Sequence, residues 1–180
     1  MVQIDSIIGN KKALEVVLFL AYHSGQTFSY GQLQHKTKLA KATLTKWLHF
    51  MTHLNYIICT TIGRNKMYTI NKDKAVIKQL KILVNVSQLN SFSGVLHKSG
   101  YEVYLFGSAA RGEDIETSDI DILLIGKSNR EALMDEVRAL EKKLHKEIKL
   151  QLFTAGEWLR LREKDPAFYE RVEKDKILLQ

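Results

Sequence analysis

Two pairs of residues in the second half of the chain have the types and the spacing to bind a metal ion and a polyphosphate. Asp119 and Asp121 stand two residues apart in an apolar run, so a strand there would point both carboxylates to the same side. Two carboxylates on one face suit Mg²⁺ or Mn²⁺, because these cations prefer oxygen ligands. Gly107 permits a turn that a side chain would obstruct, and Ser108 begins a short helical segment whose backbone N–H groups and hydroxyl suit a phosphate. The spacing therefore predicts a joint site for a divalent cation and a polyphosphate.

The residues around these two pairs resemble the DNA polymerase beta type nucleotidyltransferase superfamily, and within it the minimal nucleotidyltransferases of archaea and bacteria. The family pattern is Gly-Ser, then Arg-Gly, then Ser-Asp-x-Asp, and the matching residues of this chain are Gly107, Ser108, Arg111, Gly112, Ser118, Asp119 and Asp121. The likeness is best over residues 100–126 and extends more weakly to the C-terminus. It implies an α/β domain over residues 100–180, with a mixed sheet and helices, that transfers a nucleoside monophosphate from a nucleoside triphosphate such as ATP to an acceptor.

The resemblance also implies a role for each matching residue. The implied metal ligands are Asp119 and Asp121, which would hold Mg²⁺ or Mn²⁺, and the implied nucleotide contacts are Gly107, Ser108 and Arg111. In that scheme the Gly-Ser pair holds the β- and γ-phosphates while an acceptor hydroxyl attacks the α-phosphorus. Arg111 would neutralise charge on the departing pyrophosphate, and the alternative is a surface arginine paired with Glu113 or Asp114.

A third carboxylate is the open question of this site. Active members of the superfamily generally place it on a neighbouring strand, which is predicted here over residues 147–153. The polar face of that strand offers Glu147, Lys149 and Gln151, and only the first of these is an acid. The predicted catalytic residues are therefore Asp119, Asp121 and Glu147. Glu147 stands at the start of the strand, so a solvated strand-edge acid is the alternative, and with Gln151 in the third position the site would bind nucleotide and metal with little turnover.

The remaining elements of the second half follow from hydrophobic periodicity. Strands are predicted over residues 101–106 and 119–125, and a helix is predicted to begin at Ser128, where Glu131 completes a capping box. With the third strand, this order predicts a mixed sheet with helices on one face. Residues 156–180 are expected to form one or two helices and a short terminal strand.

Basic residues are concentrated in the first part of the chain. Residues 1–72 carry nine Lys and Arg against two acids, whereas residues 73–180 carry eighteen of each. The net charge of +7 therefore lies entirely in the first part. This asymmetry predicts that residues 1–72 bind a polyanion.

A helix is predicted to join the two parts. Residues 73–89 carry apolar side chains at helical spacing, and the polar pair Asn90-Ser91 that follows predicts a break between two halves. A single proline and the absence of Ser/Gly-rich stretches argue against a flexible linker. The predicted domains are residues 1–72 and residues 100–180, joined by a helical linker over residues 73–99.

The first 72 residues resemble an α+β winged helix-turn-helix domain in the order of their predicted elements. These are a first helix capped by Asn10, a second over residues 30–38 after Ser29, a third over residues 40–55, and a hairpin that turns at residues 63–65. Small, hydroxyl and basic side chains of the third helix face outward. The expected DNA contacts are Thr45, Lys46 and His49 near bases, and Lys38, Lys41, Arg64 and Lys66 at phosphates. The alternative is a winged-helix module that serves dimerisation or the docking of a partner.

Apolar runs and cysteine content narrow the class of protein. No apolar run is long enough to cross a bilayer and the first residues lack the zones of a signal peptide, so a cytoplasmic location without a membrane partner is expected. The single cysteine, Cys59, excludes an internal disulfide and disfavours a zinc-thiolate site. Cys59 is expected to be a small buried residue of a strand.

Two functions are compatible with the sequence. The first is a Mg²⁺-dependent nucleotidyltransferase whose winged helix binds DNA, acting as a self-regulating antitoxin with a protein acceptor such as a toxin encoded beside it. The second is a winged-helix transcription regulator whose degenerate transferase domain senses a nucleotide and changes the affinity for DNA. Either would be compatible with a homodimer, which many winged-helix proteins form.

Overall fold

The chain forms two compact units, Met1–Lys78 and Gln79–Gln180, in a computed structural model that describes residues 5–127 and 133–179. Helix α5 (Ala75–Lys98) begins in the first unit and continues into the second. The break predicted at Asn90-Ser91 is wrong, because α5 is continuous through both residues. Leu89 and Phe92 on either side of the pair are buried in the core of the second unit, whereas Asn90 and Ser91 are exposed. The polar pair therefore marks the solvent side of a packed helix and not its end.

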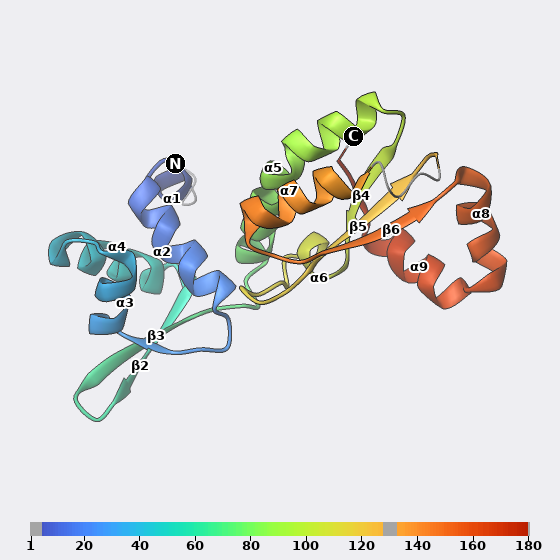
Figure 1. The fold of residues 1–180 in the computed structure, drawn as a ribbon. Helices are drawn as coiled ribbons and strands as arrows, with labels where there is room; N and C mark the ends of the chain where they lie inside the picture. The colour runs from blue at the N-terminus through green and yellow to red at the C-terminus, as the bar shows by residue number, and fades with distance from the viewer. Residues whose placement is uncertain (1–4, 128–132, 180) are drawn as a thin grey trace. The chain divides into compact units, whose positions relative to one another are not determined.

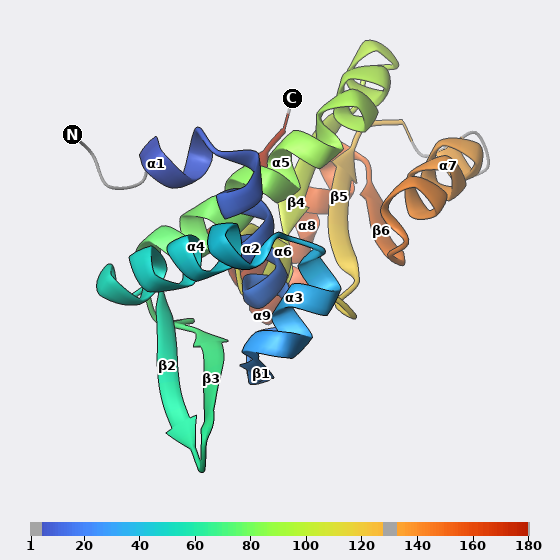
Figure 2. The same cartoon turned by 90° about the vertical axis from the view of Figure 1, so that its left-hand side faces the viewer.

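The first unit contains three main helices and a small antiparallel sheet (Figures 1 and 2). Its elements are α1 (Asp5–Ile8), α2 (Lys11–Tyr22), β1 (Phe28–Ser29), α3 (Tyr30–Thr37), α4 (Lys41–His53), β2 (Ile57–Ile62) and β3 (Asn65–Ile70). The predicted caps are confirmed: the Asn10 side chain accepts hydrogen bonds from two backbone N–H groups of α2, and Ser29 and Gln32 form a capping box at α3. The predicted hairpin is confirmed as β2 and β3, which extend away from α4 in Figure 2.

Apolar side chains of α2 and α4 form the interior of the first unit. The buried residues of these helices are Ala13, Val16, Val17, Leu20, Ala21, Leu44, Trp47, Leu48 and Met51. The sequence did not predict β1, which pairs with β3 and completes a sheet in the order β1-β3-β2. A strand of two residues carries too little periodicity to be detected from sequence, and its pairing with β3 is a long-range contact.

The second unit is built on a mixed four-stranded sheet, as predicted. Besides α5 its elements are β4 (Glu102–Phe106), α6 (Gly107–Ala110), β5 (Ile120–Ile125), α7 (Met134–Leu144), β6 (Ile148–Phe153), α8 (Ala155–Lys164), α9 (Pro166–Asp175) and β7 (Ile177–Leu178). The strand order is β6-β5-β4-β7, with β5 parallel to β6 and the other pairs antiparallel. The one or two helices and the short terminal strand expected over residues 156–180 are confirmed as α8, α9 and β7. The helix start predicted at Ser128, with Glu131 as its capping partner, lies outside the described residues.

Helices cover both faces of this sheet, so the prediction of helices on one face is wrong (Figure 1). On one face Ile122 and Leu124 of β5 pack with residues of α5, α6 and α7. On the other face Leu123 and Ile125 pack with Trp158 of α8 and with α9. A central strand that is apolar on both sides must be covered on both sides, which is why a second helical layer is required. None of the described helices is long and apolar enough to span a membrane.

Candidate active site and candidate nucleic-acid interface

The aspartate pair lies at the start of β5, one of the two inner strands of the second unit's sheet. Asp121 is the second residue of β5, and Asp119 immediately precedes that strand. Both lie on the side of the sheet opposite to Ile120 and Ile122, as the alternation of a strand requires. In the register of the sheet Asp121 stands between Phe106, the last residue of β4, and a residue of β6. The chain turns at Gly107 directly after Phe106, so the Gly-Ser turn and the carboxylates share one edge of the sheet.

Gly107 is in direct contact with the carboxylate of Asp121. Its φ is +71°, a backbone conformation that side-chain-bearing residues rarely adopt. A Cβ at this position would collide with Oδ2 of Asp121 and would stand 3.1 Å from its Cγ. Glycine is therefore required at position 107 for two reasons: the backbone conformation and the close approach of the Asp121 carboxylate.

Replacing Gly107 by Ala is expected to lower activity more than stability. The strained backbone costs about 1–3 kcal/mol, and displacement of the Asp121 carboxylate by about an ångström costs about 100-fold in a reaction that depends on it. Gly100→Ala is the matched control, because Gly100 has a φ of +87° and no heavy atom within 4 Å of the added Cβ. Thermal melts should show a loss for both variants, larger for Gly107→Ala because of the added collision, whereas only Gly107→Ala should lose transfer activity. Equal activity of the two variants would contradict a role for this contact.

The charges of Asp119 and Asp121 suit the binding of a cation. Burial, and then the negative charge of Asp119, raise the pKa of Asp121, while the positive charges of Lys149, Arg111 and Arg171 oppose that rise. The Lys149 ammonium forms an ion pair with Asp119. Two like charges held side by side in a partly buried position are the donor set that a divalent cation would neutralise. The residues present therefore fit a two-carboxylate metal site.

Arg111 is engaged by two carboxylates. Its Nε lies 2.9 Å from Oε2 of Glu113, and its Nη1 lies 2.7 Å from Oδ2 of Asp175. The first contact is the surface pairing that the sequence left as an alternative, and the second connects α6 to the end of α9. Asp114, the other partner considered, is buried and contacts different residues.

Glu147 precedes β6, and its backbone carbonyl accepts a hydrogen bond of 2.9 Å from the N–H of Ile120. Asp119 and Glu147 both line a small polar pocket of about 160 Å³. No group of three or more His, Cys, Asp and Glu side chains that could hold a metal ion occurs within residues 5–127 and 133–179. The β6 residue paired with Asp121 is Lys149, and Gln151 pairs with Leu123 one step further along.

A buried polar network anchors the loop between the Gly-Ser turn and the aspartates. The carboxylate of Asp114 accepts a hydrogen bond of 3.1 Å from Nδ2 of Asn85 and lies 3.4 Å from Nζ of both Lys81 and Lys146. The same Asn85 amide group donates to the carbonyl of Ala109 at 3.0 Å. Sequence reasoning missed this network, because polar residues of α5 carry no signal that they will be buried against a loop some thirty residues away.

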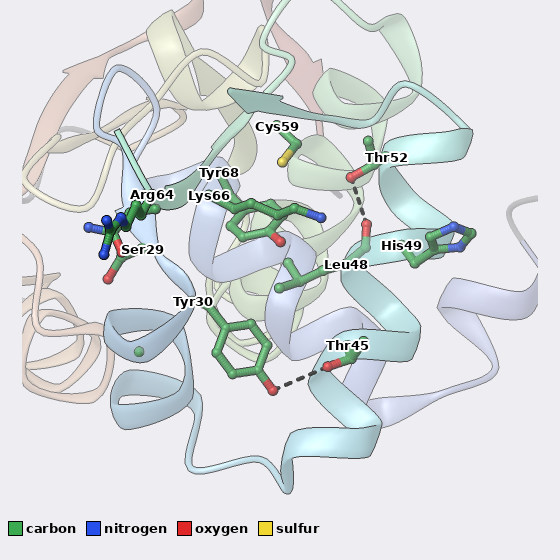
Figure 3. Close-up of a pocket in the computed structure, with 12 residues that line it drawn as sticks. Ser29, Tyr30, Thr45, Leu48, His49, Thr52, Cys59, Arg64, Lys66 and Tyr68 are labelled. Carbon is green, nitrogen blue, oxygen red and sulfur yellow. Dashed lines mark hydrogen bonds between the residues drawn. The ribbon is translucent and has the colours of Figure 1, made fainter. Parts of the chain in front are cut away.

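A groove of about 760 Å³ lies in the first unit (Figure 3). Its lining residues come from β1, α3, α4 and the β2–β3 hairpin, and they are Ser29, Tyr30, Gly31, Thr45, Leu48, His49, Thr52, Cys59, Arg64, Asn65, Lys66 and Tyr68. Tyr30 is held by two hydrogen bonds, because its hydroxyl donates to the carbonyl of Lys41 at 2.9 Å and accepts from Thr45 at 3.2 Å. Sequence reasoning overlooked Tyr30 and Tyr68, since aromatic residues near a strand are most often core residues.

The structure brings four of the seven predicted DNA contacts to this groove, namely Thr45, His49, Arg64 and Lys66. Lys38, Lys41 and Lys46 do not line the groove, and all seven side chains are exposed. Lys46 lies with its Nζ 5.0 Å from the centre of the Trp47 ring. Cys59 was expected to be buried and is in fact half-buried, because it faces the groove and not the interior.

The second unit matches the model of a known protein family. Residues 86–179, just over half of the chain, match the family model described as "Nucleotidyltransferase domain". A crystal structure of a provisionally assigned nucleotidyltransferase from Sulfolobus solfataricus is similar, with 25% sequence identity, coverage of 59% of this chain and 88% of that chain, and a TM-score of 0.35. No curated protein matches the chain.

Proposed function

The chain belongs to the nucleotidyltransferase domain family, and we propose that it transfers a nucleoside monophosphate from a nucleoside triphosphate to an acceptor hydroxyl with the help of Mg²⁺ or Mn²⁺. The observation that carries this proposal is the contact between Gly107 and Asp121. It joins the turn that the family uses for phosphate to the carboxylates that suit a metal ion. A polyphosphate on the turn and a cation on Asp119 and Asp121 would then be neighbours.

The positions of the Gly-Ser turn and of the two aspartates support a role for each residue in this reaction. Asp119 and Asp121 would hold the divalent cation, which offsets the unfavourable charge on the partly buried Asp121 carboxylate. When bound, such a cation acts as a Lewis acid toward phosphate oxygens. Gly107 and Ser108 would hold the β- and γ-phosphates. Arg111, held by Glu113 and Asp175 beside the end of α6, would neutralise charge on the departing pyrophosphate.

A labelling experiment tests this function. Purified protein is incubated with a nucleoside triphosphate labelled at the α-phosphate, with Mg²⁺, and with cell extract. We expect transfer of the label to a macromolecule, and we propose a protein acceptor, such as a toxin encoded beside an antitoxin of this type. Protease treatment should release such a label, whereas nuclease treatment should not. The Asp121→Asn protein is the control for label transferred by other enzymes of the extract.

A second candidate function is a nucleotide-sensing regulator, and the observation that favours it is Lys149. This lysine stands beside Asp121 on β6, on the strand where active superfamily members carry a third carboxylate. In a regulator of this kind nucleotide binding without transfer would change the affinity for DNA, and DNA would change the affinity for nucleotide by the same factor. Nucleotide binding by the purified protein without label transfer to any extract component would favour this candidate.

For the first unit we propose a winged helix-turn-helix domain that binds DNA. Helix α4 would enter the major groove with Thr45, Lys46 and His49 near base edges. The hairpin would act as the wing, with Arg64 and Lys66 at the phosphate backbone. The exposure of these side chains, the basic excess of residues 1–72 and the groove between α4 and the hairpin support this proposal.

DNA binding through these residues is expected to depend steeply on salt. Each phosphate contact contributes about 0.9 to the slope of log affinity against log salt concentration, so Arg64→Ala should reduce the slope by about that amount. Lys12→Ala is the control, because Lys12 is an exposed lysine of the same unit that does not line the groove. Fluorescence anisotropy with duplex DNA measures both slopes. A flat salt response of the wild-type protein would exclude this mode of binding.

A further inference from the structure

Lys149 stands beside both carboxylates of the proposed metal site. It pairs with Asp121 in the parallel register of β5 and β6, and neighbouring strands are about 4.8 Å apart. Paired residues point to the same side of a sheet, so Lys149 shares the face of Asp119 and Asp121. Its ammonium reaches back along that face to the ion pair with Asp119. The ammonium of Lys149 therefore already occupies one of the two carboxylates that a metal ion would need.

We propose that Lys149 is a built-in counter-cation that competes with the divalent metal for Asp119 and contacts the phosphates of a bound nucleotide. In the free domain the ammonium partly neutralises the aspartates and lowers their affinity for metal. A bound triphosphate offers the ammonium a second anionic partner and releases Asp119 to the metal. This inference rests on the proposed metal and nucleotide site, and it assigns to that site a coupling in which nucleotide and metal favour each other.

The solvent exposure of the ion pair between Lys149 and Asp119 limits how much Lys149 can change the metal affinity. The Lys149 side chain is 53% exposed and the Asp119 side chain 29% exposed, so solvent screens their attraction. Ion pairs at such positions change an equilibrium by about 2- to 5-fold, and the competition should lower the metal affinity by a factor in that range. Charge-assisted hydrogen bonds to phosphate are stronger than contacts to neutral groups. Loss of the ammonium should therefore weaken metal-free nucleotide binding.

The proposal predicts effects of opposite sign from one substitution. Lys149→Met removes the charge and keeps the apolar stem, and Lys149→Arg is the matched control that keeps the charge. In a titration followed by electron paramagnetic resonance, Mn²⁺ alone should bind Lys149→Met about 2- to 5-fold more tightly than wild type. Calorimetry with ATP in the presence of EDTA should show weaker nucleotide binding by Lys149→Met. Lys149→Arg should resemble the wild type in both measurements, and thermal melts establish that both variants are folded.

Two results would overturn the proposal. One is unchanged or weaker Mn²⁺ binding by Lys149→Met, and the other is a change of the same sign for Mn²⁺ and for ATP. The Asp119→Asn variant separates this inference from the proposed function. If Asp119→Asn loses Mn²⁺ binding while Lys149→Met does not gain it, the metal site stands and only the competition is wrong. If Asp119→Asn binds Mn²⁺ as the wild type does, the proposed metal site is wrong and the competition is wrong with it.

Discussion

Asp121→Asn is expected to reduce nucleotidyl transfer by about a thousandfold, which corresponds to about 4 kcal/mol of lost transition-state stabilisation. Asn has the size of Asp but lacks the negative charge that holds a divalent cation. Asp121 lies in β5 with Gly107 against its carboxylate, so strand pairing and this contact fix the position of the charge that Asn removes. Initial rates of label transfer measure the loss.

The fold of the same variant should be unaffected. Burial and the charge of Asp119 already disfavour the ionised form of Asp121 by raising its pKa, so a neutral amide at this position should melt at the wild-type temperature or above it. Asp135→Asn serves as the control, because Asp135 is an exposed residue of α7. Full transfer activity of folded Asp121→Asn would show that the catalytic site lies elsewhere. A large fall in melting temperature would show that the folded protein is stabilised by the ionised carboxylate of Asp121, contrary to this prediction.

Asp114→Ala is expected to destabilise the protein by about 3–5 kcal/mol, the usual cost of removing one partner from a buried ion pair. The Asp114 side chain is 1% exposed and the Lys81 side chain 4% exposed. Removal of the carboxylate takes away the buried ion pair of Lys81 and one of the acceptors of Asn85. Urea denaturation measures the free energy of unfolding. Glu113→Ala is the control, since the exposed pair of Glu113 with Arg111 is worth about 1 kcal/mol at most.

The pH dependence of the Asp114→Ala variant provides a second check. Burial lowers the pKa of Lys81, and the charge of Asp114 opposes that shift. Without Asp114 the pKa of Lys81 falls further, so between the lowered pKa and the ordinary lysine value the folded variant binds fewer protons than its unfolded chain. Its stability should therefore rise with pH across that window, more steeply than that of the wild type. A parallel pH dependence of the two proteins would show that Lys81 does not depend on Asp114.

The local geometry of the candidate active site followed from the sequence. The Gly-Ser turn, the strand alternation of Asp119 and Asp121 and the end of the preceding strand all depend on residues close together in the chain. The caps at Asn10 and Ser29 are local for the same reason. Such features involve one turn of a helix or a few residues of a strand, and residue type and spacing are enough to predict them.

The register of β6 could not be predicted in this way. Glu147, Lys149 and Gln151 alternate on one face of their strand, and the sequence favoured Glu147 only because it is the one acid among them. The choice depends on the pairing of β6 with β5, a contact between segments that lie almost thirty residues apart. A shift of two residues would have placed Glu147 or Gln151 beside Asp121 without turning any side chain to the other face.

The sequence by itself determined which chemical groups lie where β4 ends and β5 begins. They are a glycine turn, a hydroxyl and two carboxylates at the spacing that suits phosphate and metal. Only the tertiary structure decided what surrounds them. It placed Lys149 beside Asp121, engaged Arg111 with Asp175 and buried Asp114 against α5. Local motifs depend on residues close together in the chain, so residue spacing predicts them. Counter-ions and buried partners come from distant segments, and their positions depend on how the strands pair and the helices pack.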